Sequence, residues 1–92
     1  MTLSDLESLL RNAGVPETLY VMDGGLGAGE CVGLEPFAGG WRVYYSERGQ
    51  KTPLESFADE DGACRDMVRQ VVRMMRDSGV TVSPVLASAA SG

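Results

Sequence analysis

One stretch of the sequence, EDGACRDMVRQVVRMMRD at residues 60–77, constrains the fold more than any other part of the chain. Its apolar residues recur at three- and four-residue spacing and form a single stripe, which consists of Cys64, Met67, Val68, Val71, Met74 and Met75. Acidic residues precede the stripe, arginines lie near its end and Gly79 follows it, an order that complements the helix dipole. The pattern predicts a helix over residues 60–77 whose apolar side is covered by the remainder of the chain.

The residues before this helix predict a second helix and a small sheet. Leucines at helical spacing in residues 3–13 indicate an amphipathic helix that ends at Gly14. Because the following strand-like segments are short and close together, we expect consecutive hairpins, with Pro53 restricting the last strand to an edge or an end. The segments with strand character are TLYVMDG (18–24), ECVGLEPF (30–37), WRVYYS (41–46) and TPLESF (52–57).

These elements predict one α+β domain over residues 1–79. We expect a small antiparallel sheet of three or four strands, with an N-terminal and a C-terminal helix packed on one face (α-β-β-β-(β)-α). The last segment, VTVSPVLASAASG at residues 80–92, is rich in alanine and serine and predicts a largely disordered tail. A further strand at residues 80–82 is the alternative that its valines leave open.

Alternation along the strands assigns side chains to the two faces of the sheet. The residues expected to face the helices are Leu19, Val21, Val32, Leu34, Trp41, Val43 and Tyr45. The residues expected on the opposite, open face are Tyr20, Met22, Cys31, Gly33, Glu35, Arg42 and Tyr44. Since Cys31 and Cys64 then lie on opposite sides of the sheet, we expect two free thiols.

Composition narrows the classes of function. Eight basic against thirteen acidic residues give a net charge of −5, which disfavours a nucleic-acid partner. The chain has no histidine, the commonest metal ligand, and GGLGAG lacks the spacing of a nucleotide-binding loop. We therefore expect no catalytic residue, no metal and no cofactor. The absence of a signal peptide pattern and of a membrane-spanning apolar run predicts a cytoplasmic protein without a membrane partner.

The remaining features indicate protein binding. Tyr44 is expected on the open face beside Arg42, and tyrosine with arginine is typical of protein interfaces. The acids at the strand ends are expected to form a rim that attracts a basic partner. The predicted partner interface consists of Tyr20, Asp23, Glu30, Glu35, Arg42, Tyr44, Glu47 and Arg48. The alternative is that these residues are ordinary cross-strand pairs on a solvated face.

The run GGWRVYYSERGQ at residues 39–50, followed by LESFADEDGACRDMVRQVVRMM, resembles small immunity proteins of actinobacterial polymorphic toxin systems. In that family, a W-x-V-Y-Y-S-E-R-G-like strand and turn leads through a short strand into an E-x-A-C-like helix start. The helix-to-strand segment LESLLRNAGVPETLYVMDG also suits the family, so the resemblance covers residues 3–76. The chain departs from it at Gly62, where a better helix former is expected, and after Gly79.

The resemblance implies a non-catalytic protein that binds a cognate toxin in the producing cell and covers the active site of that toxin. Such a protein is expected to be a monomer or a weak dimer when free. The alternative function is a small regulatory or structural homodimer that associates through the open sheet face or an edge strand.

Overall fold

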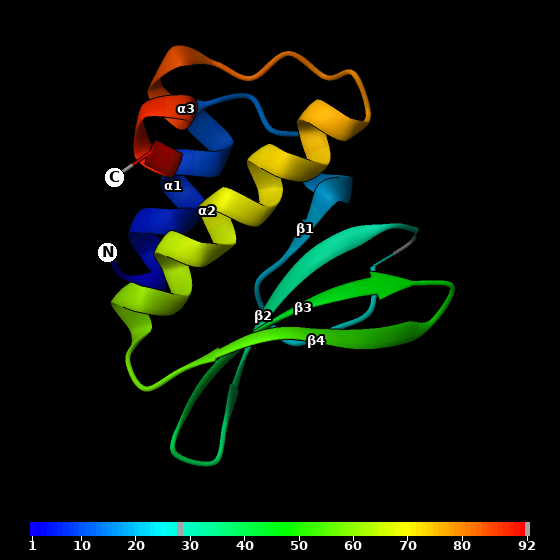
Figure 1. Ribbon diagram of the computed structural model, residues 1–92, viewed down its shortest axis with the longest axis vertical. Coiled ribbons are helices and arrows are strands. Elements are labelled where there is room, and N and C mark those ends of the chain that lie inside the picture. Colours follow the sequence, from blue (N-terminus) through cyan, green and yellow to red (C-terminus); the bar gives the residue numbers. More distant parts are fainter. Residues whose placement is uncertain (28, 92) are drawn as a thin grey trace.

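The structure is a computed structural model that describes residues 1–27 and 29–91. Within these residues the chain forms an α+β fold, as predicted, with the helices gathered on one side of a four-stranded sheet (Figure 1). Its elements in chain order are α1 (Leu3–Asn12), η1 (Glu17–Leu19), β1 (Tyr20–Val21), β2 (Cys31–Phe37), β3 (Gly40–Glu47), β4 (Gln50–Phe57), α2 (Glu60–Asp77) and α3 (Pro84–Ser91).

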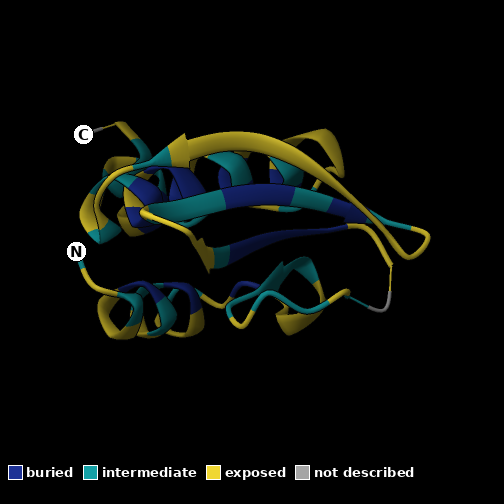
Figure 2. Ribbon diagram, turned by 90° about the horizontal axis from the view of Figure 1, so that it is seen from below, coloured by how far each residue is buried: buried dark blue, intermediate teal, exposed yellow. Residues whose placement is uncertain are grey.

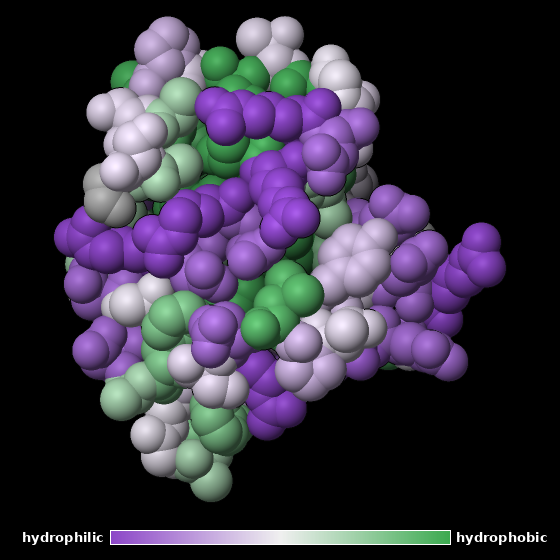
Figure 3. Space-filling model, in the orientation of Figure 1, coloured by the Kyte–Doolittle hydropathy of each residue, from purple (hydrophilic) through white to green (hydrophobic). Residues whose placement is uncertain are grey.

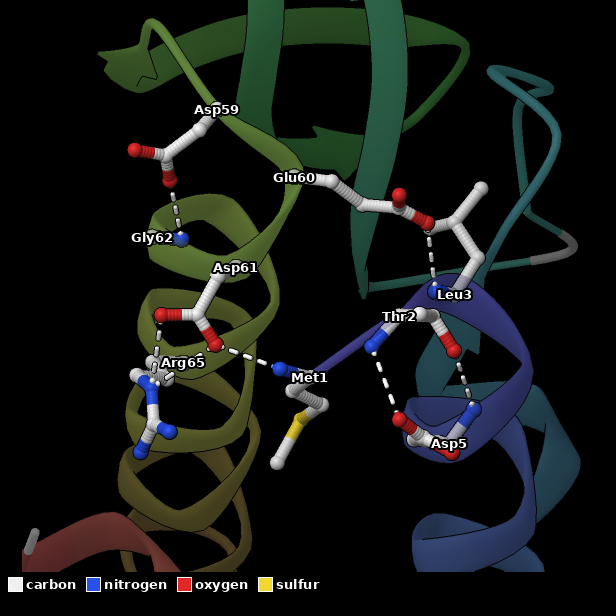
Figure 4. Close-up of polar contacts among 9 residues, drawn as sticks. All are labelled: Met1, Thr2, Leu3, Asp5, Asp59, Glu60, Asp61, Gly62 and Arg65. Atoms are coloured by element: carbon white, nitrogen blue, oxygen red, sulfur yellow. Dashed lines mark hydrogen bonds and ion pairs between the residues drawn. The ribbon is translucent and has the colours of Figure 1, made fainter.

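The long apolar stripe forms α2, with the bounds that the sequence predicts. The side chain of Asp59 caps this helix by accepting a hydrogen bond of 2.7 Å from the backbone N–H of Gly62 (Figure 4). The structure also explains the glycine in the first turn. A Cβ at Gly62 would lie 3.0 Å from the Asp59 carboxylate and 3.2 Å from the ring of Phe57, so the capped turn leaves little room for a side chain.

One hydrophobic core joins the helices to the sheet. Its strand residues are Val32, Leu34 and Val43, which the alternation of β2 and β3 places on the helix side as predicted. The residues that α1, α2 and α3 contribute to this core are Leu6, Leu10, Ala63, Cys64, Met67, Val68, Val71, Val72, Met75 and Leu86. None of the described helices combines the length and the apolar character that crossing a bilayer requires.

The prediction of an all-antiparallel sheet is wrong at its first strand. The sheet order is β1-β2-β3-β4, but β1 runs parallel to β2, with Tyr20 opposite Val32 and Val21 opposite Gly33. The connection from β1 to β2 is therefore not a hairpin loop, because parallel neighbours require the chain to return to the starting end of the sheet. The residues of this connection that the structure describes, 22–27 and 29–30, are called the glycine segment here.

The parallel pairing also changes the face of Tyr20. Because Tyr20 pairs with Val32, it lies on the helix side and packs against the core, whereas the sequence placed it on the open face. The change of face accompanies the 3-10 turn of η1, which directly precedes the two-residue strand. Val21 takes the opposite side, in contact range of the glycine segment at Gly25.

The other two strand pairs are antiparallel, as predicted. Arg48 and Gly49 join β3 to β4, and their φ angles of 52° and 78° are those of a two-residue turn that matches the twist of a hairpin. A β-bulge follows, because Val43 pairs with Glu55 whereas Tyr44 pairs with Pro53. Strand β4 is the edge strand that Pro53 required, and it is exposed along almost its whole length (Figure 2).

The prediction of a disordered tail is wrong for residues 84–91, which form α3. The hydroxyl of Ser83 accepts a hydrogen bond of 3.3 Å from the backbone N–H of Leu86 at the start of this helix. Hydrophobic burial explains why this segment is ordered. Leu86 is fully buried in the core, and the residues that pack against the core are Val80, Val82, Ala89 and Ala90. Residues 80–82 do not form the alternative strand.

We predict that Leu86→Ala lowers the free energy of unfolding by about 2 kcal/mol, because it removes a fully buried side chain from the core. Chemical denaturation monitored by circular dichroism measures the change. The matched control is Val85→Ala, since the neighbouring Val85 is 67% exposed and its truncation should have almost no effect. Equal stability of the two variants would mean that α3 is not packed on the core.

Candidate functional site

The two neighbouring tyrosines of β3 point to opposite faces of the sheet, as predicted, but their roles are exchanged. Tyr44 lies on the face away from the helices, where the sequence predicted an exposed anchor, and it is 0% exposed. Its hydroxyl donates a hydrogen bond of 2.5 Å to the carbonyl oxygen of Gly25, so the glycine segment covers it. The prediction that Tyr44 contacts a partner is therefore wrong.

Two glycines, which have no side chain, make room for the Tyr44 ring and for the glycine segment that covers it. A Cβ at Gly33 would lie 2.0 Å from Cζ of Tyr44, and a Cβ at Gly27 would lie 2.4 Å from Sγ of Cys31. Burial raises the pKa of Tyr44 to about 12, with a smaller contribution from the carboxylate of Glu35. The aromatic ring on this face thus holds the fold together.

Charged side chains hold the glycine segment on the sheet. Lys51 Nζ donates to the carbonyl oxygen of Gly24, lies 2.8 Å from Oε2 of Glu35 and sits 4.7 Å from the centroid of the Tyr44 ring. Arg42 lies 3.9 Å from Glu35 and stacks over the ring of Phe37 at 4.7 Å. Two predicted interface residues, Glu35 and Arg42, therefore have partners within their own sheet.

Tyr45 was predicted to be a core residue, but it is only partly buried. A groove of about 380 Å³ lies between Tyr45 on the sheet and the last turns of α2, where Arg73, Met74 and Asp77 contribute to its lining. We call this feature the Tyr45 groove. Its lining residues are Glu30, Val32, Tyr45, Leu54, Gln70, Arg73, Met74, Asp77 and Ser78. On this side of the molecule, hydrophilic side chains cover α2 and a hydrophobic group lies between α2 and β4 (Figure 3).

Three of the predicted interface residues gather beside Tyr45. Glu30 lines the groove and also an adjoining hollow that contains Glu47 and Arg48. Desolvation raises the pKa of the Tyr45 hydroxyl, and the nearby carboxylates of Glu30 and Glu47 raise it further. Arg48 lies 3.9 Å from Glu47 with a side chain that is 92% exposed. The structure thus places two acids beside one partly exposed tyrosine, with the exposed Arg48 next to Glu47.

The remaining predicted residues, Tyr20 and Asp23, lie elsewhere, along a separate hollow beside α1 and β1. The carboxylate of Asp23 accepts a hydrogen bond of 3.0 Å from the backbone N–H of Gly25 and so shapes the glycine segment. Tyr20 and Asp23 therefore do not join Glu30 and Glu47 in one surface.

Sequence reasoning missed Leu54 as a residue of this site. Leu54 is 41% exposed and lies between Pro53 and Glu55, which pair with Tyr44 and Val43, so it is the extra residue of the bulge. The bulge brings Leu54 to the side of the sheet that carries Tyr45. No local pattern in TPLESF signals this displacement, because a bulge depends on pairing with the neighbouring strand.

A buried carboxylate lies one helical turn before Gln70 on α2. Asp66 is largely buried, its Oδ2 has no hydrogen-bond partner, and its Oδ1 lies 3.6 Å from Arg69. Burial raises the pKa of Asp66 above the ordinary value of 3.8, and the opposing effect of Arg69 is smaller. The folded protein therefore favours the protonated form of this group.

We predict that Asp66→Asn stabilises the protein at pH 7 by about 1 kcal/mol, because it removes the charge of a largely buried carboxylate whose Oδ2 has no hydrogen-bond partner. Because the pKa is raised, the contribution of Asp66 to stability is fully present below pH 3.8 and is lost as the pH rises through the folded value, so the advantage of the variant should vanish near pH 3. Thermal melting between pH 3 and pH 7 measures it.

The control variant, Asp61→Asn, is expected to change stability at pH 7 in the opposite direction. The N-terminal amino group and Arg65 hold the pKa of Asp61 below its usual range, so Asp61→Asn should lower stability at neutral pH and have little effect in acid (Figure 4). If both substitutions shift the melting temperature in the same direction at pH 7, the burial of Asp66 is wrongly assigned.

Among the residues that the structure describes, no three His, Cys, Asp or Glu side chains lie close enough together to hold a metal ion. Both cysteines are buried and unpaired, as predicted, and burial raises the pKa of Cys64 to about 11. The Tyr45 groove is the candidate functional site. No protein-family model, curated protein or solved structure matches this chain.

Proposed function

We propose that the protein is a non-catalytic binding module that attaches to a protein toxin through the Tyr45 groove and occludes the active site of that toxin. One observation carries the proposal: the partly exposed Tyr45, Leu54 and Met74 surround a groove on a small domain. Tyrosine and methionine are enriched at protein interfaces, and a few such residues in a pocket supply most of the binding free energy.

Charge supports a basic partner. The chain carries a net charge of −5, and the acids Glu30, Glu47 and Asp77 lie in or beside the groove. Complementary charge speeds association and selects partners more than it adds affinity. A toxin whose active-site cleft binds a negatively charged substrate has the required basic surface, and the resemblance to immunity proteins supports this class of partner.

The second candidate, a homodimer paired through an edge strand, has one observation in its favour. Strand β4 is an exposed edge of eight residues, which is long enough to pair with a second copy. Three features of this strand oppose such pairing: Pro53 lacks a backbone donor, Lys51 and Glu55 are charged, and the strand contains a bulge. These features favour a monomer with a separate binding surface.

Recovery of the partner from the producing cells tests the proposal. We expect the tagged wild-type chain to retain one basic protein in a one-to-one complex, and the enzymatic toxicity of that protein to be lost on binding. Tyr45→Ala should lose the partner. Phe37→Ala is the matched control, since Phe37 is an exposed aromatic residue outside the groove. Recovery of a homodimer alone, or of a partner that Tyr45→Ala still retains, would contradict the proposal.

A further inference from the structure

We propose that the Tyr45 groove receives an arginine side chain of the partner, with its alkyl stem between Leu54 and Met74 and its guanidinium beside Glu30 and Glu47. This inference rests on the proposed function and names the group that the groove recognises. It follows from three properties of the groove: its apolar wall, its unequal charge and the orientation of its aromatic residue toward two carboxylates.

The wall of the groove fits a long aliphatic stem. Val32 is almost fully buried and forms part of the lining, while Leu54 on β4 and Met74 on α2 contribute apolar side chains from the two facing elements. An apolar stem that enters between them removes hydrophobic surface from water on both sides. Methionine adapts readily to such a ligand because its side chain is unbranched.

The charges around the groove favour a cation at its Tyr45 end. Glu30 and Asp77 line the groove, Glu47 lies in the adjoining hollow, and Arg73 is the one basic residue of the lining. Arg48 competes for Glu47, but their contact is long at 3.9 Å and the Arg48 side chain is 92% exposed. Exposed ion pairs of this kind contribute little, so an incoming cation can replace it.

Arginine fits this end better than lysine. A planar guanidinium has five donors and can serve Glu30 and Glu47 at the same time, whereas an ammonium is compact and strongly hydrated. The guanidinium can also stack on the ring of Tyr45, which lines the groove together with Glu30, Leu54 and Met74. A single arginine therefore matches the stem, the two acids and the aromatic face together.

The test is a titration of the wild-type chain with butylguanidinium, which copies the arginine side chain, and with the neutral isostere butylurea. Two-dimensional NMR spectra at low ionic strength follow the backbone signals. We expect saturable shifts at Tyr45, Leu54 and Met74 with butylguanidinium and about tenfold weaker binding of butylurea, since a charge-assisted hydrogen bond is lost. The double variant Glu30→Gln, Glu47→Gln should remove this difference.

The control is Glu17→Gln, which changes an exposed acid outside the Tyr45 groove and should leave the titration unchanged. Equal affinity for the two probes, or shifts that spread over all acidic residues without saturation, would overturn the assignment of arginine. A partner protein that still binds at Tyr45 in that case would preserve the proposed function. Loss of the partner's dependence on Tyr45 would instead remove both proposals.

Discussion

Replacing Tyr44 by alanine is expected to lower the free energy of unfolding by about 3–5 kcal/mol, as truncation of a buried aromatic residue does. The ring is completely buried between the sheet and the glycine segment, and its hydroxyl bonds to Gly25. Loss of the ring removes the group over which the segment and Lys51 are held. Urea denaturation followed by circular dichroism measures the loss.

Two companion variants separate the parts of this effect. Tyr44→Phe removes only the hydroxyl and leaves the Gly25 carbonyl without that donor, so we expect a loss of about 1 kcal/mol. Gly33→Ala should lower stability by about 1–3 kcal/mol, because its Cβ would lie 2.0 Å from Cζ of Tyr44 and would displace the ring. Near-wild-type stability of both Tyr44→Ala and Gly33→Ala would show that the glycine segment does not cover this face.

Replacing Tyr45 by alanine is expected to weaken partner binding by about 2 kcal/mol or more, which is about 30-fold in the dissociation constant. Tyr45 is the aromatic residue of the groove, and interface tyrosines in pockets are frequent anchors. Because the ring is only partly buried, the variant should melt well above Tyr44→Ala. Isothermal titration calorimetry with the partner, beside thermal melting of each variant, measures both effects.

Phe37→Ala should bind the partner with wild-type affinity, which controls for general loss of aromatic surface. Charge reversal at Glu47 should mainly slow association, most clearly at low salt, because rim charges act on the approach of the partner. Wild-type affinity of Tyr45→Ala would place the interface outside the groove.

Much of the fold follows from local patterns. Period-two alternation placed Val32, Leu34 and Val43 on the helix side, and the apolar stripe gave the bounds of α2, because both periods depend only on backbone geometry. The parallel pairing of β1 was not predictable in this way. It depends on the path of the glycine segment, and a glycine-rich sequence is compatible with either a hairpin loop or a connection between parallel strands.

Local patterns also did not predict that Tyr44 is buried and Tyr45 partly exposed. Alternation predicts which face a side chain takes, but it does not predict what lies over that face. The glycine segment covers Tyr44, whereas Tyr45 lines an open groove to which α2 contributes Met74 together with the charged Arg73 and Asp77. The helix α3 was missed for a related reason, since Leu86 orders the tail only through contacts with residues distant in the sequence.

The candidate site was predicted in part. The sequence identified Glu30, Glu47 and Arg48 from their place at strand ends, and the structure gathers them beside Tyr45. Leu54 enters the site through a bulge, and Met74, near the end of the α2 stripe, lines it from the helix. Both contributions depend on tertiary contacts that spacing in the sequence does not encode.

Tyr44 is buried and supports the fold, whereas Tyr45 is partly exposed and lines the Tyr45 groove. Nitration of the native protein by tetranitromethane, with each modified tyrosine located by mass spectrometry, tests this claim most directly. Tyr45 should be modified well before Tyr44, since Tyr44 is 0% exposed and its pKa is raised to about 12. Both should react at similar rates in urea, where the fold is lost. Modification of Tyr44 before Tyr45 in the native protein would contradict the account.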